Sequence, residues 1–214
     1  MLATEGDGQM SDTGIERWNK RFAQDEYVFG ERPNAFLARQ KERLAGCRSA
    51  LSVADGEGRN GVWLAEQGIR VTAVEGSPVG QEKARRLAAR RGVTLDFVLA
   101  DLATWTWPEQ AFDAVVGIFI QFAGPGLRER IFAGMRRALK PGGLLLLEGY
   151  RPEQIAYGTG GPKVEENLYT EAMLREAFAG MTIELLDAYD AEIEEGSGHA
   201  GMSALIDLVA RAPG

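Results

Sequence analysis

The sequence has one cysteine, Cys47, and one histidine, His199, among its 214 residues. A single cysteine excludes an internal disulfide, and the scarcity of both residues excludes zinc sites built from cysteine or histidine ligands. Basic residues are in the minority, because 24 Lys and Arg stand against 31 Asp and Glu and leave a net charge of −7. That balance argues against nucleic acid or an anionic membrane as the main partner.

Long apolar stretches are absent as well. The longest, Ala114–Ile120 and Leu144–Leu147, fall far short of the roughly 20 residues of a membrane-spanning helix. The first 14 residues have neither the basic end nor the apolar core of a signal peptide. We therefore expect a cytoplasmic protein without a membrane partner, with a disordered leader over residues 1–13 and a single domain over residues 14–214.

Short apolar runs alternate along the chain with longer segments of helical pattern. The predicted strands are Leu51–Ala54, Val71–Val74, Leu95–Leu99, Ala114–Ile120 and Leu144–Leu147. The predicted helices between them are Asn60–Gln67, Pro78–Arg91 and Pro125–Leu139, the last stopped by Pro141-Gly142-Gly143. This alternation is typical of an α/β fold with a parallel sheet that is buried on both faces. The basic run Lys83–Arg91 is interpreted as a solvated helix face.

Both ends of the chain depart from this alternation. A helix over Thr170–Phe178 precedes two strands, Ile183–Ile193 and Ser203–Ala210, which have no helix between them. These two strands are expected to form an antiparallel hairpin at one sheet edge. Ahead of the first strand, helical segments are predicted near Gly14–Phe22 and Asn34–Leu44.

The first strand runs into a glycine-rich loop. Gly56, Gly58 and Gly61 spell GxGxxG between a strand and a helix, the arrangement found where dinucleotides bind. Glu75 ends the next strand, where an acid can accept both hydroxyls of an adenosine ribose. The loop therefore predicts a cofactor that contains a nucleoside.

The charges of the loop favour one such cofactor. At an effective dielectric constant of about 20, unit charges about 4 Å apart interact by about 4 kcal/mol. Asp55 and Glu57 would therefore oppose the pyrophosphate of a nicotinamide dinucleotide and suit the ammonium and sulfonium of S-adenosylmethionine. Asp101, after the third strand, is placed to accept a hydrogen bond from the adenine amine. A nicotinamide-linked oxidoreductase and a non-catalytic S-adenosylmethionine-binding module remain as alternatives.

Five segments come in the order of known motifs: Leu51–Asn60, Val74–Ser77, Ala100–Leu102, Phe112–Val116 and Leu139–Gly143. Together they resemble the motifs of class I S-adenosylmethionine-dependent methyltransferases. A closer likeness, to the small group of tellurite-resistance and thiopurine methyltransferases, rests on Trp18–Phe22, Tyr27–Gly30, Gly58–Asn60, Gly149–Pro152 and Tyr157–Lys163. The resemblance implies a three-layer Rossmann-like fold with seven strands in the order 3-2-1-4-5-7-6, strand 7 being antiparallel.

The same resemblance implies methyl transfer from S-adenosylmethionine to a small-molecule acceptor, such as a thiol or a metalloid. The cofactor-binding residues that it implies are Trp18, Ala54, Asp55, Gly56, Gly58, Arg59, Asn60, Glu75, Gly76, Ser77, Asp101, Leu102, Ile118 and Gln121. The chain departs from the family in having Ser52 where an acid is usual and Ala54 where a glycine is usual. The exit of strand 4 also lacks the Asn/Asp-Pro-Pro-aromatic sequence of enzymes that methylate exocyclic base amines or glutamine amides.

The residues that contact the methyl acceptor are expected in the C-terminal part of the chain. Tyr150 and Tyr157 flank a long glycine-bearing loop, the kind of loop that often forms a lid or binding surface. His199 lies in the turn of the final hairpin, where a neutral imidazole could take a proton from a thiol or hydroxyl. The domain is thus divided into an N-terminal helical lid (14–48), a cofactor-binding core (49–150) and a substrate-side loop with the C-terminal hairpin (151–214). The acceptor and the oligomeric state stay open.

Overall fold

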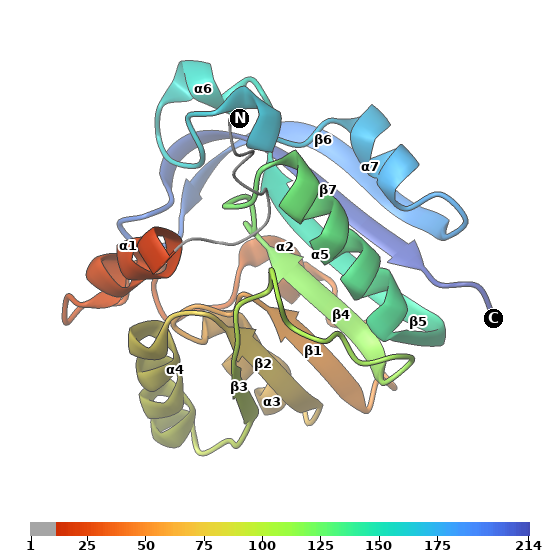
Figure 1. Ribbon diagram of the computed structural model, residues 1–214, viewed down its shortest axis with the longest axis horizontal. Helices are drawn as coiled ribbons and strands as arrows, with labels where there is room; N and C mark the ends of the chain where they lie inside the picture. The colour runs from red at the N-terminus through yellow and green to blue at the C-terminus, as the bar shows by residue number, and fades with distance from the viewer. Residues whose placement is uncertain (1–11) are drawn as a thin grey trace, which may run out of the picture.

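A seven-stranded sheet organises residues 12–214, the part of the chain that the computed structural model describes (Figure 1). Its strands are β1 (Ser49–Val53), β2 (Arg70–Glu75), β3 (Asp96–Leu99), β4 (Phe112–Ile118), β5 (Leu139–Tyr150), β6 (Thr182–Glu194) and β7 (Ala200–Arg211). The order across the sheet is β3-β2-β1-β4-β5-β7-β6, with β1 to β5 parallel and β7 antiparallel to both neighbours. The predicted fold, strand order and edge hairpin are confirmed.

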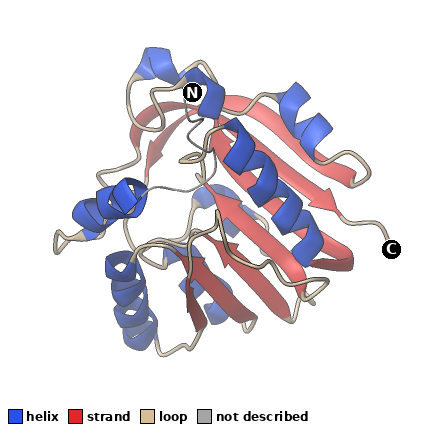
Figure 2. Cartoon of the chain, viewed as in Figure 1, coloured by secondary structure: helices blue, strands red, loops and turns tan. Residues whose placement is uncertain are grey.

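Helices cover both faces of this sheet (Figure 2). They are α1 (Asp12–Phe22), α2 (Ala35–Arg39), α3 (Arg59–Glu66), α4 (Pro78–Arg91), α5 (Pro125–Ala138), α6 (Gln154–Tyr157) and α7 (Glu171–Ala177), with a 3-10 turn at Glu165–Asn167. Within residues 12–214, none of these helices is long and apolar enough to cross a membrane. The predicted disordered leader over residues 1–13 extends too far, because α1 already begins at Asp12. The part of that leader before residue 12 lies outside the described residues.

Side chains alternate between the two faces along each central strand. On β1, Leu51 packs with α5 and α7, whereas Ala50 packs with α2 and α3. On β4, Val115 joins the first cluster and Val116 the second. Because both faces are covered, the strands read in sequence as continuous apolar runs and not as an apolar–polar alternation.

Two predicted helices end earlier than expected. Asn34 caps α2 by accepting a hydrogen bond from the Leu37 amide at 2.9 Å, but the helix stops at Arg39 and turns follow up to residue 46. Helix α5 stops at Ala138, and β5 begins at Leu139, before the Pro-Gly-Gly sequence. The physical reason is sheet pairing, because Leu139 already pairs with Phe112 of β4.

Candidate functional site

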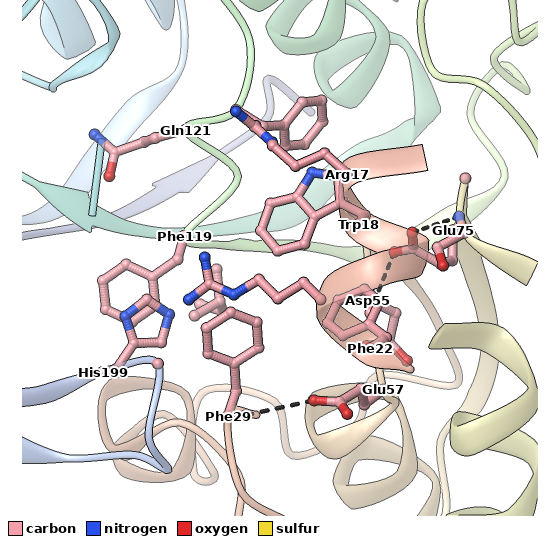
Figure 3. Close-up of a pocket in the computed structure, with 18 of the residues that line it drawn as sticks. Arg17, Trp18, Phe22, Phe29, Asp55, Glu57, Glu75, Phe119, Gln121 and His199 are labelled. Atoms are coloured by element: carbon pink, nitrogen blue, oxygen red, sulfur yellow. Dashed lines mark hydrogen bonds between the residues drawn. The ribbon is translucent and has the colours of Figure 1, made fainter. Parts of the chain in front are cut away.

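A cavity of about 510 Å³ opens at the carboxyl ends of the central strands. Its walls come from α1, the glycine loop after β1, the ends of β2 and β4, the loop after β5 and the turn between β6 and β7 (Figure 3). In the sheet, β2 lies on one side of β1 and β4 lies on the other side. The strand order therefore reverses at β1, beside this cavity. Open α/β sheets bind their ligands at this position, and the volume is that of a small-molecule site.

Most of the residues assigned from sequence line this cavity. They are Trp18, Ala54, Asp55, Gly56, Arg59, Asn60, Glu75, Gly76, Ser77, Leu102, Ile118, Gln121, Tyr150 and His199. Gly58, Asp101 and Tyr157 are not part of its wall.

Each of these three residues has another structural role. Gly58 has φ +93°, and a Cβ there would lie 2.6 Å from the Cβ of Ala84, so the glycine allows the loop to pack on α4. Asp101 accepts a hydrogen bond from the Ala103 amide at 2.9 Å and caps a turn. Tyr157 is exposed and donates to Asp190 at 3.0 Å on the outer hairpin.

Glu75 joins the end of β2 to the glycine loop. One carboxylate oxygen accepts from the Gly56 amide at 2.8 Å and the other from the Ser77 amide at 2.7 Å. The carboxylate is buried, and desolvation raises its pKa above the usual range. Each oxygen has a second lone pair, so Glu75 can accept two further hydrogen bonds from a ligand in the cavity.

The Asp55 side chain is turned into the loop. Its Oδ1 accepts from Ser52 Oγ at 2.5 Å and from the Gly61 amide at 2.9 Å, while Oδ2 is buried without a hydrogen-bond partner. Burial raises the pKa of Asp55 to about 7. Position 52 holds a serine where the family usually has an acid, and the Asp55 carboxyl group lies beside that serine. Ala54 stands where the family usually has glycine, and it adopts φ +49°.

Glu57 forms a buried ion pair with Lys83 of α4. The Lys83 Nζ and a Glu57 carboxylate oxygen lie 2.5 Å apart, and both side chains are 2% exposed. Two conclusions from sequence are therefore wrong. Lys83 does not belong to a solvated face, and Glu57 does not present a free charge to a ligand. Asp55 is also hydrogen-bonded within the loop, so both acids shape the turn. Their charges therefore do not exclude the pyrophosphate of a dinucleotide from this loop.

The raised pKa of Asp55 gives an expected dependence of stability on pH. The folded state holds the Asp55 proton more tightly than the unfolded state, whose pKa is near 3.8. The contribution of this carboxyl group is therefore present at low pH and is lost as pH rises through about 7. Between pH 5 and pH 8 the loss amounts to about 2.5 kcal/mol.

Asp55→Asn should remove that loss. Urea unfolding at both pH values should show that the wild type loses more stability than the variant does. Equal losses in the two proteins would contradict the buried, loop-bonded carboxyl group.

His199 is held between two aromatic rings on the acceptor side of the cavity. Its ring stacks on Phe29 at 4.5 Å and on Phe119 at 4.3 Å between centroids, and Nδ1 lies 2.5 Å from Tyr150 Oη. Burial and the nearby Arg59 and Arg21 charges lower the pKa of His199 well below its usual value, so the ring is neutral at pH 7. Phe119 has φ +54°, a strained conformation that places its ring here.

Helix α1 forms one wall of the cavity. Trp18 stacks on Phe22 at 5.3 Å, and both rings lie within 6.3 Å of Phe29. Arg17 and Arg21 follow the same face of the helix and line the cavity, with their guanidinium groups over the Trp18 ring. Neither of these arginines nor Phe119 was singled out from the sequence. The two arginines are four residues apart, and this spacing could have indicated that they share a helix face with Trp18.

The remaining polar residues of the wall are engaged by the protein. Arg59 pairs with Glu195 at 2.7 Å and donates to the Phe29 carbonyl at 3.2 Å, so it is neither the partner of Glu57 nor a free cation. Asn60 accepts from the Asn34 amide at 3.0 Å and does not cap its own helix. The Gln121 side chain bonds the Tyr150 backbone in both directions and fixes the exit of β4 to the end of β5.

Comparisons with known proteins agree with this geometry. Residues 50–143 match the family model described as a methyltransferase domain. A demethylmenaquinone methyltransferase of Thermus thermophilus is 34% identical over 111 residues, which are 50% of this chain and 50% of the relative. A sterol 24-C-methyltransferase of Gibberella zeae is 29% identical over 138 residues, 59% of this chain and 36% of the relative. The chain thus spans half or less of the curated relatives that it matches.

Solved structures share the fold at low sequence identity. The N-methyltransferase NodS of Bradyrhizobium japonicum, in complex with S-adenosylhomocysteine, is 15% identical with a TM-score of 0.73, and the match covers 95% of this chain and 100% of that one. TehB of Haemophilus influenzae is also 15% identical, with a TM-score of 0.68 and coverage of 93% and 67%. The likeness to TehB shows a common fold alone, so the tellurite-resistance and thiopurine group stays a prediction.

The nicotinamide-linked alternative finds no support in the family match. Residues 50–143 thus match a methyltransferase domain, and the sheet around them has the strand order that the resemblance to class I S-adenosylmethionine-dependent methyltransferases implies.

Proposed function

We propose that this protein transfers a methyl group from S-adenosylmethionine to a small organic acceptor. The observation that carries the proposal is the composition of the cavity. The glycine loop and Glu75 form its cofactor side, and the Tyr150–His199 pair faces them from the other end. One cavity therefore has groups for a nucleoside and groups that can act on a second molecule.

The residues present fit the cofactor. The free lone pairs of Glu75 would accept the two ribose hydroxyls, and Gly56, which has no side chain, would allow the backbone to approach the ligand. Ala100 and Leu102 give an apolar wall for the adenine, and the Trp18 ring closes the site from α1. When bound, the cofactor supplies an electrophilic methyl group on a sulfonium whose leaving group is a neutral thioether.

The work left to the protein is mainly positioning and exclusion of water. Correct placement of two reactants can contribute about 7–11 kcal/mol to a reaction of this kind. The rings of Phe29 and Phe119 hold His199 in one orientation, and Tyr150 occupies its Nδ1. In the tautomer whose Nδ1–H donates to Tyr150 Oη, Nε2 has a free lone pair. We assign to Nε2 in this tautomer the proton that the acceptor gives up when its lone pair attacks the methyl carbon. Tyr150 is a positioning residue for that step.

The acceptor is assigned here only as a small organic molecule. The matched relatives are named for a sterol and for demethylmenaquinone, and NodS is named as an N-methyltransferase. These names favour carbon or nitrogen acceptors over the metalloid considered from sequence, and a thiol remains a candidate because it needs little help from a base.

Calorimetric titration tests the cofactor assignment. S-adenosylmethionine and S-adenosylhomocysteine should bind the wild-type protein, and NAD should bind much more weakly or not at all. Tighter binding of NAD than of S-adenosylmethionine would overturn the proposal.

Glu75→Ala should weaken S-adenosylhomocysteine by about 1.5–3 kcal/mol, the range for hydrogen bonds to a charged group. That free energy corresponds to a loss of about tenfold to more than a hundredfold in affinity. Glu75→Gln should lose less, because the amide keeps an acceptor oxygen. Unchanged affinity in a folded Glu75→Ala protein would show that the ribose is held elsewhere.

A further inference from the structure

The cavity wall carries three cations that form no ion pair with the side chains of residues 14–214. Arg17 and Arg21 come from α1, and Lys163 comes from the loop after β5. Across the side chains of residues 14–214, none of the three lies within 4.0 Å of a carboxylate. This contrasts with Arg59 and Lys83 of the same region, each of which forms a buried ion pair.

The acids of the cavity are engaged elsewhere, although the charge of Glu57 acts favourably on Arg21 from a distance. Glu57 is paired with Lys83, and Glu75 is bonded to two backbone amides of the opposite wall. Asp55 is turned into the glycine loop. The charges of the cavity are therefore separated, with carboxyl groups at the ends of β1 and β2 and cations without an ion pair on α1 and the loop.

Arg21 lies close to His199, the proposed base. Its guanidinium group lies over the Phe29 ring at 5.1 Å, and a Cβ built on Gly198 would lie 3.0 Å from its Nη2. Gly198 directly precedes His199. Burial, and next the charge of Arg17, lower the pKa of Arg21, and the opposing effects of Glu57 and Tyr150 do not cancel this shift. The two like charges therefore oppose each other in a partly dry site. An anion placed between them would relieve that opposition.

We propose that Arg17 and Arg21, assisted by Lys163, bind an anionic group of the methyl acceptor, such as a carboxylate, beside His199. This inference rests on the proposed function and specifies its substrate class. An anion at this position would also offset the positive charge of the sulfonium. The aromatic rings of Phe29 and Phe119 would flank the body of such an acceptor.

Benzoate and its neutral isostere benzamide are suitable probes. Both should be titrated, at low salt, into wild-type protein that has been saturated with S-adenosylhomocysteine, so that the cofactor's own carboxylate is already in place. Benzoate should bind at least about tenfold more tightly than benzamide. In Arg21→Gln this preference should fall to about twofold or less, and in Arg17→Gln it should fall in part. Arg86→Gln, an exposed arginine on α4, is the matched control and should keep the preference.

Two outcomes would overturn the inference. The first is equal binding of benzoate and benzamide, or a preference that survives Arg21→Gln. The second is that Arg21→Gln weakens S-adenosylhomocysteine about tenfold but leaves methylthioadenosine, which lacks the amino acid part, unchanged; Arg21 would then hold the cofactor carboxylate. In either case S-adenosylhomocysteine would still bind the wild type. Failure of S-adenosylhomocysteine to bind would instead contradict the proposed function.

Discussion

Lys83→Met is expected to lower the free energy of unfolding by about 3–5 kcal/mol, the cost of leaving a buried charge without its partner. Glu57 is 2% exposed and has no other cation near it among the ion pairs of the described residues. Lys83 also donates to the backbone carbonyls of Gln24 at 2.9 Å and Glu26 at 2.7 Å, and so holds the segment after α1 against α4. Urea unfolding at pH 7 measures the loss.

The double variant Lys83→Met, Glu57→Gln separates the ion pair from the packing. Removing both charges should recover much of the lost stability, because an uncharged pair of similar volume costs little in a buried position. Arg86→Met, on an exposed part of the same helix, should change stability by less than about 0.5 kcal/mol. A Lys83→Met protein as stable as the Arg86→Met protein would contradict a buried pair that joins the glycine loop to α4 and to the segment after α1.

His199→Ala is expected to lower the rate of methyl transfer by about a hundredfold or more, the usual contribution of a positioned base. Since the ring is already neutral at pH 7, the rate of the wild type should change little between pH 6 and pH 8. The rate of S-adenosylhomocysteine release, measured with an acceptor fraction from a metabolite extract, gives both quantities.

Tyr150→Phe should show a smaller loss of rate, because it removes only the partner of Nδ1. Affinity for S-adenosylhomocysteine should be unchanged in both variants, since neither side chain is assigned to the cofactor. Tyr157→Phe is the matched control, because its hydroxyl bonds Asp190 outside the cavity. A full rate in a folded His199→Ala protein would remove the base from the mechanism and leave positioning alone.

Most of the fold could be predicted because buried parallel strands and amphipathic helices leave clear patterns in sequence. Helix α4 was predicted at its observed bounds, since Pro78 marks its first turn and Gly92 ends it in a left-handed conformation. The boundary between α5 and β5 was missed because the pairing of Leu139 with Phe112 depends on a strand that is distant in sequence. Local turn signals at Pro141-Gly142-Gly143 could not reveal that contact.

Residues of the cavity could be predicted when a sequence motif fixes their position. They could not be predicted when their position depends on side chains that are distant in sequence. Glu75 and the glycine loop follow from strand ends, which the sequence marks well. The charges of Asp55 and Glu57 were misinterpreted because a sequence does not show whether a carboxylate faces a ligand, a hydroxyl or a buried lysine. The place of His199 between Phe29 and Phe119 joins three distant parts of the chain, so no local pattern could indicate it.

Transfer of a labelled methyl group is the most direct test of the central claim that this cavity binds S-adenosylmethionine and passes its methyl group to a second molecule. Wild-type protein and Glu75→Ala would be incubated with methyl-labelled S-adenosylmethionine and a pooled metabolite extract. The expected result is label in a small molecule together with an equal amount of S-adenosylhomocysteine, both strongly reduced in the Glu75→Ala protein at limiting cofactor. Tight binding of S-adenosylmethionine without any transfer, across extracts of varied origin, would contradict the account and identify the chain as a non-catalytic binding module.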